Sequence, residues 1–325
     1  MTQRAIQLLK FTAKLAVTVA LLSWVFSRID FAQLVEVVKT AHWRFLWGAW
    51  ILTLVVFWLL AVKMRLIMKK LGCFTDTYTI FAVSMITSLY GMVLPGLVDN
   101  SVKWYMLKQR TGKGSNVFTS MVYNQFTTMV VMFITGLAAL IVVNPGGTWR
   151  LPLVCSVIIV VVIMLCLLLL HETAASKVAG VFRFLLRPFP QAVQDVVSKI
   201  IKELSIFRTA PRSFHLAQLA LAFVTSTVLA PIIYLFAAKA ARIDASIGIL
   251  VCQCAFISIL GQLPVSIADL GVREATIVGS LAIYNVDASS ALLMSMIIFS
   301  NRILMALIGA AYLLFWRMPK TPGSS

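Results

Sequence analysis

The chain has 325 residues, of which 61% are hydrophobic and 12% are charged, roughly half the charged fraction of an ordinary soluble domain. Apolar runs of about 20 residues recur along nearly the whole length, which predicts an all-α polytopic membrane protein and excludes a soluble domain or a β-barrel of short alternating strands. The formal charge of +17 comes from basic residues in short segments between the apolar runs. This is the pattern of the positive-inside rule, so we do not expect a nucleic-acid partner.

The first half of the chain contains three predicted full spans and one interrupted stretch. The spans are residues 9–26, 45–68 and 117–143, and an interfacial helix is expected at 30–39. The second span ends in the basic residues Lys63, Arg65, Lys69 and Lys70. The apolar stretch 79–97 has basic clusters on both sides, so a single crossing would place one cluster outside. A re-entrant hairpin that turns at Pro95 and Gly96 avoids this.

The second half repeats this order. Its predicted full spans are residues 153–170, 214–238 and 291–316. The long basic segment between the first two, residues 172–213, is read either as amphipathic helices on anionic headgroups or as a connecting loop that obeys the charge rule. The stretch 262–274 interrupts an apolar run with a proline, a glycine and three ionisable groups. Charge and broken backbone at membrane depth are tolerated where they face protein or water, so this stretch is the leading candidate for a site.

The two interrupted stretches resemble each other. Each carries Leu-Pro and then an acid followed four residues later by a base, Asp99 with Lys103 and Asp269 with Arg273. Each proline also lies at the same distance from the start of the preceding full span. We therefore predict two units, residues 1–150 and 151–325, arranged as an inverted repeat of six full spans and two re-entrant broken-helix hairpins. The alternative is coincidence, since Leu-Pro pairs are common in membrane helices.

The same residues carry a family resemblance. Leu94-Pro95-Gly96 with a base downstream, and Leu263-Pro264-Val265-Ser266 followed by Leu270-Gly271-Val272-Arg273-Glu274, resemble the flippase-like transmembrane region of lysylphosphatidylglycerol synthases. The resemblance covers nearly the whole chain and implies movement of lipids, particularly aminoacylated phosphatidylglycerol, between leaflets of a bacterial cytoplasmic membrane. The soluble aminoacyl-transfer domain of the synthases is not found, so synthase activity is not expected.

The chain departs from the usual pattern of this family at several positions. Val98 and Asp269 stand where the family usually has glycine, and Lys103 stands where it has arginine. Asn124 and Gln125 stand where the family often shows Glu-Arg. These departures leave the particular headgroup open.

The candidate substrate-binding residues lie in and after the two broken stretches. A helix that begins after Pro95 or Pro264 points free amides and the positive end of its dipole toward a ligand, which suits a phosphate. The complete set of candidates is Pro95, Asp99, Lys103, Pro264, Ser266, Asp269, Arg273, Glu274 and Arg302.

The charged candidates allow two interpretations. The bases Lys103, Arg273 and Arg302 either bind phosphodiester oxygens or are neutralised within the protein. The acids Asp99, Asp269 and Glu274 either hold a headgroup amine or supply that neutralisation. Asp269 is equally compatible with a helix N-cap, and Arg273 with Glu274 is compatible with an internal ion pair that fixes the broken helix.

These observations predict a lipid translocator that binds an anionic or zwitterionic phospholipid headgroup. The alternatives are a transporter of polyprenyl-phosphate-linked sugars, or a non-transporting scaffold for a lipid-modifying enzyme. We expect no enzyme activity, cofactor or metal, because no nucleophile–base or metal-ligand pattern occurs. The basic residues place both termini in the cytoplasm, and a homodimer is left open.

Overall fold

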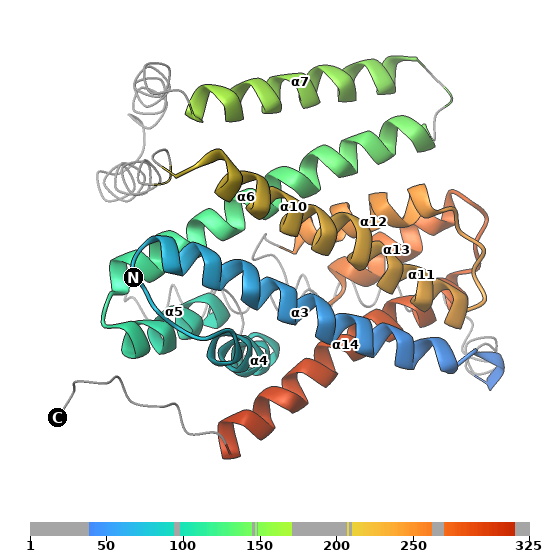
Figure 1. The fold of residues 1–325 in the computed structure, drawn as a ribbon. Coiled ribbons are helices and arrows are strands. Elements are labelled where there is room, and N and C mark those ends of the chain that lie inside the picture. The colour runs from blue at the N-terminus through green and yellow to red at the C-terminus, as the bar shows by residue number, and fades with distance from the viewer. Residues whose placement is uncertain are drawn as a thin grey trace, which may run out of the picture.

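The structure is a computed structural model that describes residues 39–93, 98–144, 147, 149–170, 207, 210–261 and 270–315. Regular secondary structure in this part is helical throughout (Figure 1). The first half consists of α3 (Arg44–Lys70), α4 (Thr77–Val93), α5 (Val98–Thr111) and α6 (Gly114–Val143). The second half consists of α7 (Arg150–Leu170), α10 (Arg212–Phe223), the π-helix η2 (Val224–Leu229), α11 (Ala230–Ala240), α12 (Ile247–Leu260), α13 (Val272–Ala282) and α14 (Ala288–Phe315).

Four stretches of the described chain are long and apolar enough to cross a membrane. They are Arg44–Lys70, Gly114–Val143, Arg212–Ala240 and Ala288–Phe315. These coincide with four of the six predicted full spans, and α7 covers a fifth as a helix. The sixth predicted span, residues 9–26, lies outside the described residues, as do residues 30–38 and nearly all of the basic segment 172–213. The described part therefore agrees with a helical membrane protein.

Both interrupted stretches are flanked by short helices. Helices α4 and α5, of 17 and 14 residues, precede and follow residues 94–97. Helices α12 and α13, of 14 and 11 residues, precede and follow residues 262–269. None of these four helices reaches the roughly 20 residues that a full crossing needs. Short helices on either side of each stretch are compatible with the predicted hairpins, but Pro95 and Pro264 lie outside the described residues, so the breaks at these prolines stay a prediction.

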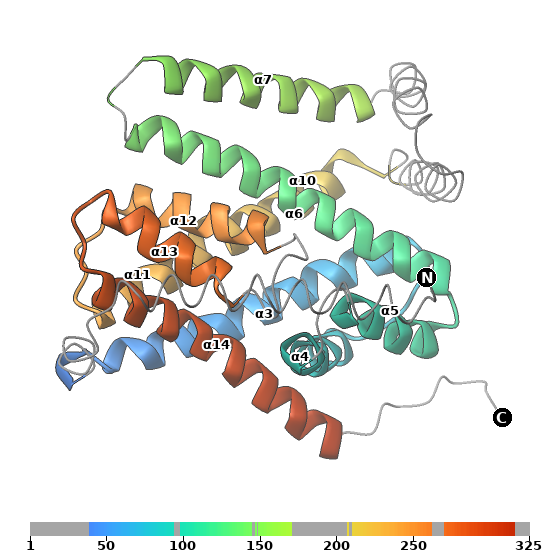
Figure 2. The same cartoon turned by 180° about the vertical axis from the view of Figure 1, so that it is seen from behind.

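The two halves of the chain pack against each other through exchanged partners. The short helix α4 packs along α14, and the short helix α12 packs along α6 (Figures 1 and 2). The third extensive contact joins α3 to α11. Helix α14 is the most enclosed of the four long spans. Half of the residues in its most apolar segment are buried, against 17 to 22% in the corresponding segments of the other three spans. The described bundle is thus one body built from both halves, and α14 is the most enclosed of its long helices.

Small residues allow the closest of these contacts. A Cβ atom added at Gly309 of α14 would lie 2.1 Å from the carbonyl oxygen of Met85 in α4. One added at Gly136 of α6 would lie 2.6 Å from the Cβ of Ala255 in α12. The hydrophobic effect drives helices together only weakly in a membrane, because the surrounding lipid is as apolar as the helix surface. Membrane helices therefore gain stability from such close backbone packing.

The span Arg212–Ala240 is not one regular helix. The sequence predicts an uninterrupted span here, but six residues, Val224–Leu229, form a π-helix. Pro231 follows at the beginning of α11. Proline has no amide hydrogen and its ring clashes with the preceding turn, so a wider turn before it relieves both problems.

An aromatic cluster fixes residue 207 against the bundle. The ring of Phe207 stacks on Tyr123 of α6 with centroids 4.0 Å apart. His215 of α10 bridges the two, with Nε2 3.0 Å from the Phe207 carbonyl oxygen and Nδ1 2.8 Å from the Tyr123 hydroxyl. A carbonyl oxygen can only accept, so Nε2 of His215 is the donor in the hydrogen bond to Phe207.

Asp76 caps the N-terminus of α4 outside the spans. Its carboxylate accepts hydrogen bonds from the Thr79 amide at 2.8 Å and the Thr79 hydroxyl at 2.7 Å. Partial burial acts to raise the pKa of Asp76, but the Thr79 hydrogen bonds and the charge of Arg110 outweigh it and hold the pKa below its ordinary value. The charged form is therefore the one that stabilises the helix.

Replacing Asp76 by alanine is expected to lower the stability of the protein by about 1 kcal/mol at neutral pH, because the cap is lost. A carboxyl group with a lowered folded-state pKa stabilises above its unfolded pKa, and this contribution disappears as the pH falls through the folded value. Thermal unfolding in detergent should therefore show a smaller difference between wild type and Asp76→Ala at roughly pH 3 than at pH 7. Asp76→Asn is the control, since its amide oxygen caps without titrating. An equal difference at both pH values would contradict the assignment.

Candidate functional site

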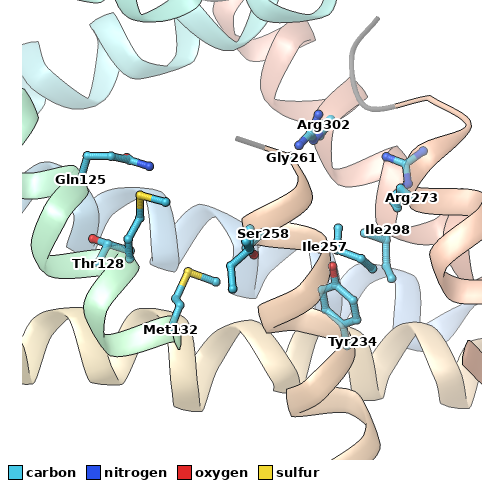
Figure 3. Close-up of a pocket in the computed structure, with 12 residues that line it drawn as sticks. Gln125, Thr128, Met132, Tyr234, Ile257, Ser258, Gly261, Arg273, Ile298 and Arg302 are labelled. Carbon is cyan, nitrogen blue, oxygen red and sulfur yellow. The ribbon is translucent and has the colours of Figure 1, made fainter. Parts of the chain in front are cut away.

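A cavity of about 290 Å³ lies in the bundle between α6, α11, α12, α13 and α14. Figure 3 shows Gln125 and Thr128 of α6 on one side of it and Arg273 and Arg302 on the other. The polar lining residues are Gln125, Thr128, Tyr234, Ser258, Arg273 and Arg302, and the apolar ones include Met129, Met132, Ile257, Ile259 and Ile298. Two arginines that line a cavity between apolar helices mark a functional site by default, because charge within a membrane protein is costly.

The start of α13 positions Arg273. Gly271 precedes the helix with φ at 83°, a left-handed conformation that glycine adopts without steric cost. The Gly271 amide donates to Glu274 Oε2 at 2.7 Å, which ties the carboxylate back over the first turn. Arg273 therefore lies near the end of the interrupted stretch 262–274, on a first helical turn fixed by its neighbours.

Arg273 is buried, with 3% of its surface exposed. Its three side-chain nitrogens are in different situations. Nε donates to Ser295 Oγ at 3.2 Å, and Nη2 donates to Glu274 Oε1. The guanidinium also lies over the ring of Phe299, 4.6 Å from its centroid. Nη1 is buried and has no hydrogen-bond partner among the described residues. One edge of a fixed guanidinium in the cavity wall thus has unused donors.

Glu274 is fully engaged by the protein. Oε2 accepts from the Gly271 amide, and Oε1 accepts from Arg273 and from the Ser295 hydroxyl at 3.2 Å. This is the geometry of the internal ion pair that the sequence allows as one alternative. Glu274 therefore holds Arg273 in place, and its charge offsets one of the two arginines of the cavity.

Arg302 lies on α14 about two turns beyond Ser295 and contributes to the same cavity. The structure thus brings together Arg273, Glu274 and Arg302 from the predicted set. Asp99 and Lys103 are one turn apart on α5, where the Asp99 side chain lies against Gly91 of α4. Within the described residues, α5 contributes nothing to the lining of this cavity. The remaining candidates, Pro95, Pro264, Ser266 and Asp269, lie outside the described residues.

Lys63 differs most from its expected place. The sequence groups it with the basic residues at the end of α3, but its side chain is fully buried inside the bundle. Its Nζ donates to Thr128 Oγ1 at 2.7 Å and to the Asn124 carbonyl oxygen at 3.3 Å. Arg65, Lys69 and Lys70 are exposed, as expected. The sequence alone does not distinguish Lys63 from these exposed residues, because Lys63 is buried by the packing of α6 against α3.

The cavity residues that sequence reasoning missed are mostly neutral. Thr128, Tyr234 and Ser258 carry hydroxyl groups but sit in ordinary apolar helices with no motif around them. Gln125, which with Asn124 stands where the resembled family often shows Glu-Arg, also lines the cavity. A lone hydroxyl in a span is compatible with an internal bond to its own helix, so the sequence offers no signal for these residues.

Comparison with known proteins gives one match. Residues 11–310 match the family model described as the lysylphosphatidylglycerol synthase TM region. No curated protein and no solved structure matches the chain.

Proposed function

Since the chain belongs to the family of the lysylphosphatidylglycerol synthase TM region, we propose that it moves a lipid with a phosphate-bearing headgroup between the leaflets of its membrane. The family and the apolar helices support a multi-pass membrane protein concerned with lipids. The single observation that carries the translocator proposal is Arg273, whose buried Nη1 lacks a partner among the described residues and lines a cavity.

A phosphate suits this arrangement. A buried guanidinium edge without a partner costs free energy, and a phosphate oxygen would supply the missing acceptor. The plane of the guanidinium is fixed by Glu274, Ser295 and Phe299, so a ligand meets an oriented donor. Arg302 adds a second positive group from α14. The methionine and isoleucine side chains of the lining offer an apolar surface to the glycerol and acyl part of a lipid.

The helix order supports a transport mechanism. Each half contains a long span, two short helices around a break, and another long span, and the short entry helix of each half packs on the last span of the other. We propose that these are the two units of an inverted repeat, in which the broken helices flank the substrate path. Under this proposal, rocking of one unit against the other would expose the cavity to each leaflet in turn. By the charge rule, both termini would lie in the bacterial cytoplasm.

Purified protein in liposomes tests this function directly. Fluorescent phosphatidylglycerol and phosphatidylcholine are placed in both leaflets, and an impermeant quencher then reports the fraction that reaches the outer leaflet. We expect faster movement of phosphatidylglycerol than in protein-free liposomes, since the phosphate there is not offset by a choline. Rates equal to those of protein-free liposomes for both lipids would overturn the proposal and favour a scaffold for a lipid-modifying enzyme.

A further inference from the structure

Lys63 is a buried ammonium with neutral partners. It lies on α3 with no exposed surface, and its Nζ donates to the Thr128 hydroxyl and to the Asn124 carbonyl, both on α6. Among the described residues, no carboxylate pairs with it. A buried positive group without a counter-charge is costly, so it is retained where it serves a ligand or a switch.

Thr128 connects this lysine to the cavity. Its Oγ1 accepts from Lys63 and donates its own proton to the Asn124 carbonyl oxygen at 2.9 Å. The same side chain lines the cavity opposite Arg273 and Arg302 (Figure 3). Lys63 therefore lies directly behind the wall that a ligand would touch. If the Thr128 hydroxyl turns its proton from the Asn124 carbonyl oxygen to an anion in the cavity, the positive charge of Lys63 strengthens that hydrogen bond, because Oγ1 still accepts from Lys63.

The charges of Lys63, Arg273 and Glu274 do not balance. Lys63 and Arg273 contribute two positive groups, and one carboxylate among the described residues, that of Glu274, pairs with Arg273. Both oxygens of Glu274 already accept hydrogen bonds from the protein. Among the described residues, a headgroup amine would therefore meet positive groups and no open carboxylate, whereas a phosphate would meet the Arg273 edge on one side and the Thr128 hydroxyl on the other.

We propose that Lys63 is a positioning residue of this cavity that acts through Thr128, and that it selects headgroups of net negative charge over aminoacylated ones. This inference rests on the proposed function and names its substrate class. Phosphatidylglycerol carries one phosphodiester charge and no amine. Its lysylated form carries two amines against one phosphodiester and so is net positive. The cavity should favour the former, although the family takes its name from the latter.

The test compares the initial rates at which phosphatidylglycerol and lysylphosphatidylglycerol move between the leaflets of phosphatidylcholine liposomes that contain the protein. We expect the wild-type protein to move phosphatidylglycerol about tenfold faster or more. Lys63→Met, which keeps an unbranched side chain without the charge, should lower that rate about tenfold and narrow the ratio between the two lipids. Lys63→Arg should retain the preference. Thr128→Val should resemble Lys63→Met, and the double variant should be no worse than either, because the two residues act in one chain.

The outcomes separate the inference from the function it rests on. A wild-type protein that moves phosphatidylglycerol, together with a Lys63→Met variant that keeps the same lipid ratio, overturns the inference and leaves translocation intact. A wild-type protein that moves neither lipid overturns both. Thermal unfolding in detergent checks that each variant is folded, and Lys63→Met should be at least as stable as the wild type because it removes a buried unpaired charge.

Discussion

Replacing Arg273 by glutamine is expected to lower translocation of phosphatidylglycerol at least about thirtyfold, because truncating a buried charged hydrogen-bond partner costs 2 kcal/mol or more. The glutamine amide reaches neither the position of Nη1 nor the full charge that a phosphate oxygen would meet there. The measurement is the initial rate in liposomes at equal protein density. The transport rate of Arg273→Lys should lie between those of the wild type and Arg273→Gln, since lysine keeps a positive charge but lacks the planar donor edge.

Two controls protect this result from a folding artefact. Arg273→Gln leaves the Glu274 carboxylate with fewer partners, so the double variant Arg273→Gln with Glu274→Gln removes that unpaired charge as well. If the double variant regains the wild-type melting temperature but not the transport rate, the loss belongs to the site. Arg150→Gln, at an exposed arginine at the beginning of α7, should leave the rate unchanged. Full transport by folded Arg273→Gln would remove Arg273 from the substrate path.

Gly309→Ala should be among the most destabilising single changes in the bundle. The added methyl group would lie 2.1 Å from the Met85 carbonyl oxygen and 2.6 Å from its carbonyl carbon, and backbone atoms cannot move aside as a flexible side chain can. Helix α14 would have to separate from α4 along their long contact. We expect a loss of about 3 kcal/mol or more, at the upper end of overpacking effects. Thermal unfolding in detergent, followed by the loss of monodisperse protein, measures it.

Gly279→Ala is the matched control. Gly279 lies inside α13, and a Cβ atom added there meets nothing within 4 Å. Alanine is the better helix former by roughly 1 kcal/mol, so this variant should be as stable as the wild type or slightly more stable. Equal melting temperatures for Gly309→Ala and Gly279→Ala would show that α4 and α14 are not packed as closely as described.

Hydropathy and local chemistry account for the elements that were predicted correctly. Spans such as 45–68 and 117–143 are uniformly apolar, so their length alone identifies them, and the helices begin and end within a few residues of the expected places. The prolines at 95 and 264 predict breaks because a helix rarely continues through proline without a kink, and the described helices before and after each of them are short. Arg273 and Arg302 are conspicuous in the sequence because a charge in an apolar run is rare.

The features that were missed depend on contacts between distant segments. Lys63 and Arg65 are two residues apart in one basic cluster, but α6 buries one and leaves the other exposed. Thr128 becomes part of a cavity only because α12, α13 and α14 complete the opposite wall. The exchange of partners between the halves, with α4 on α14 and α12 on α6, is likewise invisible in the linear pattern. Hydropathy predicts which segments enter the membrane but not which face of each meets which neighbour.

The π-helix before Pro231 determines which side of α11 faces the cavity. A π turn accommodates one residue more than an α turn, so the chain at Val224–Leu229 carries an extra position relative to a regular helix. Removing one residue there would rotate all of α11 by roughly 100° about its axis. Tyr234, which lines the cavity, would then point elsewhere. The rotation of α11 that the π-helix sets is thus part of the site. A sequence alignment with a relative that lacks the extra residue needs a gap here, since otherwise residues on different faces of α11 would be aligned.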